Sequence, residues 1–402
     1  MIINYKTIVK FNLIYSMIDL KRETFFTKWN IPLTIITALL LLINHRPGYI
    51  SALSVWTLMI LFFLPLVRFI NTNFCGVIIF TIMYSLFAAN SGFLSTFSSA
   101  IAYILPLPAF YLFGRYVMSK INRSEDFYKF IIILLFAYTL DIFLSIYLDI
   151  YLTGSLVNER RTFSFYFGQG DELAATLVGM QVYPCLIGFV LFFIIRKTKK
   201  VLAYLYLLVA VSALLTTAHL INRTGLVIFV MASSLMIINQ NRKNLPKLIL
   251  LTIIIVTIVG VAMHSYDIAN TDLISAYSDR GDDVSTAGSR TFLWSHAIKN
   301  LFLHPMGWSD NYKYIHNMWL DIAKVAGVIP FLILVFLTIR SMITLYRILR
   351  FRTAEISTAF LGLYVCFFLS LFVEPVCGST HLFLFVMLWG MQESYLYKLR
   401  KS

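Results

Sequence analysis

The sequence has 402 residues, of which 59% are hydrophobic and 13% are charged, and its mean hydropathy is +0.80. A soluble domain is about half apolar and about a quarter charged. The composition therefore excludes a soluble globular protein and indicates an all-α integral membrane protein.

A membrane-spanning helix needs roughly 20 mostly apolar residues, and the chain divides into about twelve such segments. We predict a single polytopic membrane domain over residues 1–402. Residues 1–28 mix basic residues with aromatics and isoleucines, which favours a cytoplasmic segment lying in the membrane interface. The predicted spans are 29–44, 49–67, 73–90, 97–114, 127–152, 173–195, 201–218, 225–239, 248–265, 317–339, 357–374 and 380–397.

The net charge of +14 comes from Lys and Arg residues that gather in alternate connections between the predicted spans. With both termini in the cytoplasm, most of the 33 Lys and Arg residues fall in the terminal segments, the short inner loops or the inner helix ends. This distribution follows the positive-inside rule, so the charge indicates membrane orientation and not a nucleic-acid partner.

Two outer loops are long enough to carry function, because loops on a rigid scaffold commonly hold binding and catalytic residues. They cover about residues 153–172 and 266–316, and the second is the longest polar segment of the chain. Within it, Thr291–Phe302 has apolar residues at helical spacing. We expect a short amphipathic helix there, lying on the membrane or capping a cavity.

Neither a metal nor a nucleotide cofactor is expected. The four cysteines lie in or beside apolar segments without paired spacing. The sequence has no His/Cys cluster with zinc spacing, no glycine-rich phosphate loop and no nucleotide-binding domain. ATP hydrolysis on a domain of its own is therefore excluded as the driving force.

Four arginines lie near the outer ends of predicted spans. Guanidinium groups bind phosphate and diphosphate through paired hydrogen bonds and stay charged at any working pH. The arginines therefore suit a lipid-linked diphosphate, whereas the alternative is interface anchoring or pairing with acids such as Glu159 and Asp171. They are Arg160, Arg161, Arg223 and Arg290.

His316 stands where the long outer loop enters an apolar helix, with Asn317 and Asp321 on one face beside it. A neutral imidazole can accept a proton from an attacking hydroxyl group. The alternative is a histidine that caps or packs the helix. Asn317 and Asp321 would orient the ring or satisfy the free N–H groups of the helix start, and Asp321 and Lys324 would neutralise each other.

Three further ionisable residues are less informative. Asp141 falls in the middle of the fifth predicted span, where a buried and paired carboxylate is the favoured interpretation. Glu374 and His381 flank the last outer loop, where either could contact a substrate.

Four segments, in this order, resemble motifs of the O-antigen ligase/polymerase superfamily. The first departs from the family pattern, because Asp171 and Glu172 replace the usual asparagine; the last has Pro330 where the family favours a small residue or tyrosine. The segments are Arg161 with Phe167–Ala174, then Asn222–Gly225, then Arg290–Trp294 with His304–Gly307, and finally His316 and Asn317 with Gly327.

The resemblance implies an enzyme of the bacterial inner membrane that transfers a glycan from undecaprenyl diphosphate to an acceptor hydroxyl, without nucleotide or metal. His316 would be the general base, and Arg223 and Arg290 would hold the donor diphosphate. Arg161 would position donor or acceptor. The loops and the active site would face the periplasm, and a chain-length regulator protein is a possible partner.

Three functions stay open. The first is a polymerase of the Wzy type, which transfers the growing chain to the non-reducing end of a new lipid-linked repeat unit. The second is a ligase that transfers the finished chain to lipid A-core. The third is a lipid-linked oligosaccharide flippase, which we expect to have short loops and cationic residues inside its spans. The long outer loop favours an enzyme, and the departures from the common motifs favour the polymerase.

Overall fold

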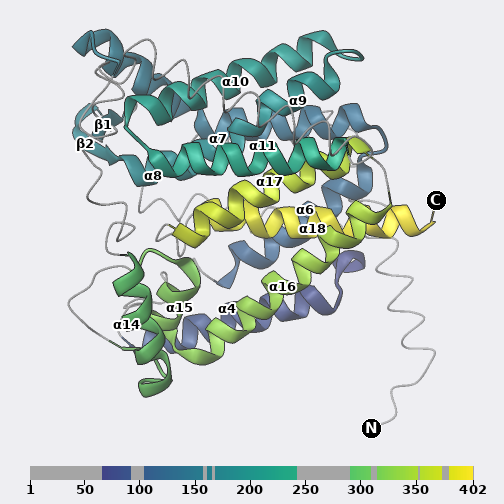
Figure 1. The fold of residues 1–402 in the computed structure, drawn as a ribbon. Coiled ribbons are helices and arrows are strands. Elements are labelled where there is room, and N and C mark those ends of the chain that lie inside the picture. Colours follow the sequence, from purple (N-terminus) through teal and green to yellow (C-terminus); the bar gives the residue numbers. More distant parts are fainter. Residues whose placement is uncertain are drawn as a thin grey trace.

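The computed structural model describes residues 66–91, 104–156, 161–164, 168–241, 290–308, 315–351, 354–373 and 380–401. They form a bundle of helices with one short β-hairpin (Figure 1). In chain order the elements are η1 (Leu66–Phe69), α4 (Thr72–Asn90), α6 (Pro106–Lys120), α7 (Ser124–Thr153), β1 (Arg161–Ser164), β2 (Gly168–Ala174), α8 (Ala175–Val182), η2 (Tyr183–Ile187), α9 (Gly188–Ile195), α10 (Lys200–His219), α11 (Arg223–Gln240), α14 (Arg290–Leu303), α15 (Met318–Ala326), α16 (Val328–Arg350), α17 (Ala354–Val373) and α18 (Thr380–Lys401).

Seven helical segments within these described ranges are long and apolar enough to cross a membrane. This confirms the α-helical membrane class, and each of the seven overlaps a predicted span. The predicted spans 29–44 and 248–265, and most of 49–67, lie outside the described residues. The described helices of the predicted spans 97–114 and 380–397, α6 and α18, are not among the seven, so a total of about twelve spans stays a prediction. The seven are Thr72–Asn90, Ser124–Thr153, Val178–Ile195, Lys200–His219, Arg223–Gln240, Val328–Arg350 and Glu355–Val373.

The predicted span 317–339 is wrong in its first part, because the helix breaks at Gly327. Gly327 has φ of 82°, a left-handed conformation that favours glycine. A side chain there would also collide with the backbone of Pro305 and Met306. The chain therefore forms two helices, and the membrane-length helix α16 begins only at Val328.

The predicted outer loop 153–172 includes most of an antiparallel hairpin. Strands β1 and β2 pair Arg161 with Ala174 and Phe163 with Glu172, and the register shifts after Phe163. The predicted helix within the second loop is confirmed as α14. Leu293, Ala297 and Leu301 form its buried face.

The bundle has two chemically different ends. At one end lie the hairpin, α14, α15 and the start of α11, which we call the loop end (Figure 1). At the other end, Lys199 pairs with Glu125 at 2.8 Å, and the Lys398 ammonium donates to the Ile121 carbonyl at 2.6 Å. We call this the basic end, because it gathers Arg115, Lys120, Arg123, Arg196, Lys197, Lys199, Lys200, Arg347, Arg350, Lys398, Arg400 and Lys401.

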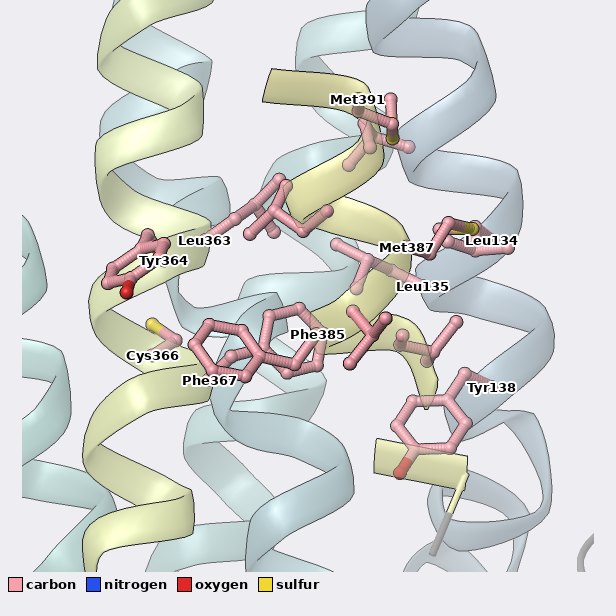
Figure 2. Packing of buried hydrophobic residues seen from close by; sticks show 14 of the residues in the cluster. Leu134, Leu135, Tyr138, Leu363, Tyr364, Cys366, Phe367, Phe385, Met387 and Met391 are labelled. Carbon is pink, nitrogen blue, oxygen red and sulfur yellow. The ribbon is translucent and has the colours of Figure 1, made fainter. Parts of the chain in front are cut away.

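Helix α18 forms the centre of the core. Figure 2 shows Phe385 and Met387 of α18 between Phe367 of α17 and Leu134 of α7. On another side α18 lies against α6, where Gly390 faces the Tyr111 carbonyl and Gly114 faces the Met387 carbonyl. Small residues at such a crossing let two membrane helices approach closely, which strengthens their dispersion contacts.

Gly390→Ala tests this crossing. The added methyl group would overlap the Tyr111 backbone, which cannot move as a side-chain end can. We expect a loss of about 1–3 kcal/mol in the free energy of unfolding, measured by thermal unfolding in detergent. Gly76→Ala is the matched control, since its methyl group would meet the flexible end of Leu337 at 2.8 Å. Equal stability of the Gly390 variant and wild type would contradict the close crossing.

Candidate functional site

His316 lies in a strained turn at the loop end. Its φ is 57°, in the left-handed region, and Ile221 is the other non-glycine residue with positive φ in the described ranges. Such conformations cost free energy and persist only where the surroundings impose them, so they cluster at functional sites. The His316 side chain is partly exposed, whereas Ile315 and Asn317 on either side are buried.

Asn317 caps helix α15 and ties it to α17. Its side-chain oxygen accepts from the Leu320 N–H at 3.2 Å, and its Nδ2 donates to the Phe372 carbonyl at 3.0 Å. An asparagine at this position satisfies one of the free N–H groups of a helix start. Of the two sequence interpretations for Asn317, the structure supports helix capping.

Asp321 holds the backbone on both sides of His316. Its carboxylate accepts from the Ile315 N–H at 2.8 Å and from the Asn317 N–H at 3.4 Å. Asp321 is buried on α15, which is not among the candidate membrane-spanning helices. Burial raises the pKa of its carboxyl group to about 6, against the opposing effects of these two N–H groups, His316 and Lys324.

The turn after α14 packs against the break between α15 and α16. The Trp308 N–H donates to the Lys324 carbonyl and the Val328 N–H donates to the Pro305 carbonyl, each at 2.9 Å. Gly307, with φ of 102°, would meet the Lys324 carbonyl at 2.8 Å if it carried a side chain. The segments His304–Gly307 and His316–Gly327, which belong to two separate sequence motifs, are therefore in contact.

Arg290 is the first residue of α14, a helix that packs beside the His316 turn. Leu293 and Ala297 of α14 share a small apolar cluster with Ile315 and Leu320. The Trp294 ring lies 5.1 Å from the Phe372 ring, beside the carbonyl that Asn317 binds. Helix α14 thus joins the arginine motif to the histidine motif.

Arg223 is the first residue of α11 and directly follows the capping residue Asn222. In the same way, Met318 begins α15 directly after the capping residue Asn317. The Asn222 side-chain oxygen accepts from the Gly225 N–H at 3.2 Å and from the Tyr183 hydroxyl at 2.9 Å. Ile221, directly before it, has φ of 48°. A left-handed residue, a capping asparagine and a helix start therefore occur twice at the loop end.

The two remaining predicted arginines are only partly placed. Arg161 begins β1 and pairs through its backbone with Ala174, so it belongs to the loop end. Its side chain and the whole of Arg160 lie outside the described residues. The prediction that they bind substrate stays a prediction.

The sequence interpretation missed a buried pair close to Arg223. The Nε2 of His219 lies 3.0 Å from an Asp149 carboxylate oxygen, and its Nδ1 lies 3.2 Å from the Leu156 carbonyl. A carbonyl only accepts, so Nδ1 donates in this contact. His219 thus joins the ends of α7 and α10 to the segment leading to the hairpin, four residues before Arg223. The sequence did contain a signal for this pair, because Asp149 and His219 both lie at the outer ends of predicted spans.

Two other residues from the sequence interpretation are buried. His381 lies within the core, where its Nε2 is 2.5 Å from the Ser370 hydroxyl and its Nδ1 is 3.5 Å from the Tyr138 hydroxyl. Asp141 is buried in the middle of α7, as expected for a residue inside a span. Within the described ranges, no group of three His, Cys, Asp or Glu side chains is placed to hold a metal ion.

No protein-family model matches the chain, and no curated protein matches it significantly. The fold defines the class as an α-helical membrane protein. The motif resemblance stays a prediction.

Asp321→Asn tests the clamp around His316 through its pH dependence. The folded carboxyl has a pKa of about 6 against an ordinary value of 3.8, so its ionisation favours the unfolded chain. The wild-type free energy of unfolding should fall by about 3 kcal/mol, relative to the variant, between about pH 4 and 7. Thermal unfolding across this range measures it, with Asp126→Asn as an exposed control. Parallel pH profiles of wild type and Asp321→Asn would contradict the assignment.

The His219–Asp149 pair has its own test. His219→Leu leaves a buried carboxylate without its imidazole, which we expect to cost about 3–5 kcal/mol of stability. Replacing both residues by Leu removes the buried carboxylate as well and should recover part of the loss. Thermal unfolding of the two variants gives the comparison. If the double variant were no more stable than His219→Leu, the buried Asp149 carboxylate would not be the cause of the loss.

Proposed function

We propose that the chain is an O-antigen polymerase, or a polymerase of a related surface polysaccharide. It transfers a glycan chain from undecaprenyl diphosphate to the non-reducing-end hydroxyl of an incoming lipid-linked repeat unit. The single observation that carries the proposal is the His316 turn, strained, clamped by Asp321 and packed against the helix that begins with Arg290. The motif resemblance supplies the substrate class.

In this mechanism His316 accepts the proton of the acceptor hydroxyl while that oxygen attacks the anomeric carbon of the donor. A new glycosidic C–O bond forms, and the bond between the anomeric carbon and the diphosphate oxygen breaks. Undecaprenyl diphosphate leaves with the bonding electron pair. The activated diphosphate provides the driving force, so neither nucleotide hydrolysis nor a metal ion is required.

The arginines stabilise the leaving group in this mechanism. Arg223 and Arg290 bind the diphosphate and offset the negative charge that develops on it, and fixed cationic donors are effective in such a role. Arg160 and Arg161 position donor or acceptor, with Arg161 at the start of the hairpin, and Asn317 keeps the His316 turn in place. The separation of these groups from the basic end supports their assignment to one reaction site.

The proposed orientation follows from the charges of the two ends. By the positive-inside rule the basic end faces the cytoplasm of a bacterial inner membrane, with both termini on that side. The loop end then faces the periplasm, where lipid-linked repeat units are joined. Its partners are the lipid-linked donor and acceptor, the surrounding lipids and a chain-length regulator protein.

The direct test is the lipopolysaccharide gel profile of a deletion strain complemented with His316→Ala. We expect core carrying a single repeat and no ladder, with at least a 100-fold loss of polymer, because general-base catalysis contributes about 10²–10⁴-fold. His304→Ala, an exposed histidine of the same region, should restore the wild-type ladder.

Two other gel profiles would contradict the proposal. Bare core with long chains accumulating on the lipid carrier would identify a ligase. A normal ladder from a His316→Ala protein at wild-type abundance in the membrane would mean that the histidine is structural.

A further inference from the structure

The basic end contains a hollow that the proposed reaction does not use. Its volume is about 350 Å³, and it is lined by Arg347, Arg350 and Phe351 at the end of α16 and by Arg400 near the end of α18. All four residues are exposed. Helix α16 has 23 residues, so this hollow lies about 34 Å along the helix from the Gly327 break at the loop end.

Within the described ranges, no acid pairs with the arginines of this hollow. Among the described residues, none of the three guanidinium groups forms an ion pair, whereas Lys129 and Lys199 at the same end share Glu125. Arg350 instead lies over the Tyr346 ring at 5.4 Å. Guanidinium groups bind phosphate oxygens in pairs, so three of them around one hollow favour an anionic phosphate ligand.

The outer surface of α16 leads from the membrane-spanning region to this hollow. A row of exposed apolar side chains runs along the helix at alternating spacings of four and three residues, which places them on one face. Arg350 is the next position of the same row. The row is Leu332, Phe336, Ile339, Ile343 and Tyr346.

We propose that the hollow binds the phosphate headgroup of an anionic phospholipid of the leaflet at the basic end. The acyl chains lie along the exposed row of α16, and the phosphates contact Arg347, Arg350 and Arg400. Free phosphate would match the arginines alone, whereas a phospholipid matches both the arginines and the apolar row. Basic pockets between membrane helices on the cytoplasmic side are known to take such headgroups.

Native mass spectrometry of the detergent-purified full chain, titrated with cardiolipin or phosphatidylcholine, tests this site. We expect one cardiolipin to bind more tightly than phosphatidylcholine. Each arginine removed should weaken cardiolipin binding about fivefold, and the triple variant Arg347→Gln/Arg350→Gln/Arg400→Gln on the order of 100-fold.

The matched control removes the same charge from the same end. Arg196→Gln/Lys197→Gln/Lys200→Gln changes exposed residues of the turn between α9 and α10, outside the hollow. It should keep the wild-type affinity. Equal losses in the two triple variants would overturn the site in favour of general surface attraction.

Two further measurements test whether the site recognises charge alone or free phosphate. A triple Arg→Lys variant keeps the charge and should bind with intermediate affinity, because lysine cannot form paired hydrogen bonds. Wild-type binding by both the Gln and Lys variants would overturn the proposal. Displacement of cardiolipin by inorganic phosphate would also overturn it, since the site would then recognise free phosphate.

Discussion

The loop end depends on a capping hydrogen bond accepted by an asparagine side chain, and this asparagine follows a residue in left-handed backbone. At α15 the pair is His316 and Asn317, and at α11 it is Ile221 and Asn222. A left-handed conformation is costly for a β-branched residue such as Ile221. At Ile221 it is imposed by two hydrogen bonds that close the end of α10, from the Ile221 N–H to the Ala218 carbonyl and from the Asn222 N–H to the Thr217 carbonyl.

In both places this arrangement puts a candidate functional residue, Arg223 or His316, at a sharp turn before a helix. At α11 the chain reverses within three residues and Arg223 immediately starts the next helix. At α15 the Asp321 carboxylate fixes the backbone on both sides of His316, which leaves the imidazole as the partly exposed group. Rigid support of this kind is what a reacting group needs, because small displacements are costly in rate.

The helices were predictable wherever the signal is local. The apolar run 201–218 becomes α10 within one residue at each end, and the periodic stretch Thr291–Phe302 becomes α14 in the same way. Hydropathy and helical periodicity depend on neighbouring residues alone, so a single sequence contains them. The sequence also offered helix capping as one role of Asn317, because a cap depends on residues that are close together in the chain.

Features that depend on distant contacts were not predictable. The break at Gly327 arises from the Pro305 turn, which packs against it from an earlier segment. The partner of Asp149 is His219, 70 residues along the chain, and the sequence interpretation weighed Asp141 instead. The left-handed conformation of His316 is held by the hydrogen bonds of Asp321 to the backbone on both sides of it. The sequence shows only that the two residues are five positions apart, not that these bonds form. The hairpin within the predicted loop 153–172 was not foreseen, because it depends on pairing between residues up to 13 positions apart.

The most direct measurement is a reconstitution of the purified protein alone in vesicles with one defined undecaprenyl-diphosphate-linked repeat unit. The vesicles contain a metal chelator and no nucleotide. We expect a series of lipid-linked multimers, with release of undecaprenyl diphosphate for each bond formed. Active wild-type protein that leaves the repeat unit as a monomer, or that needs a nucleotide to extend it, would contradict the account.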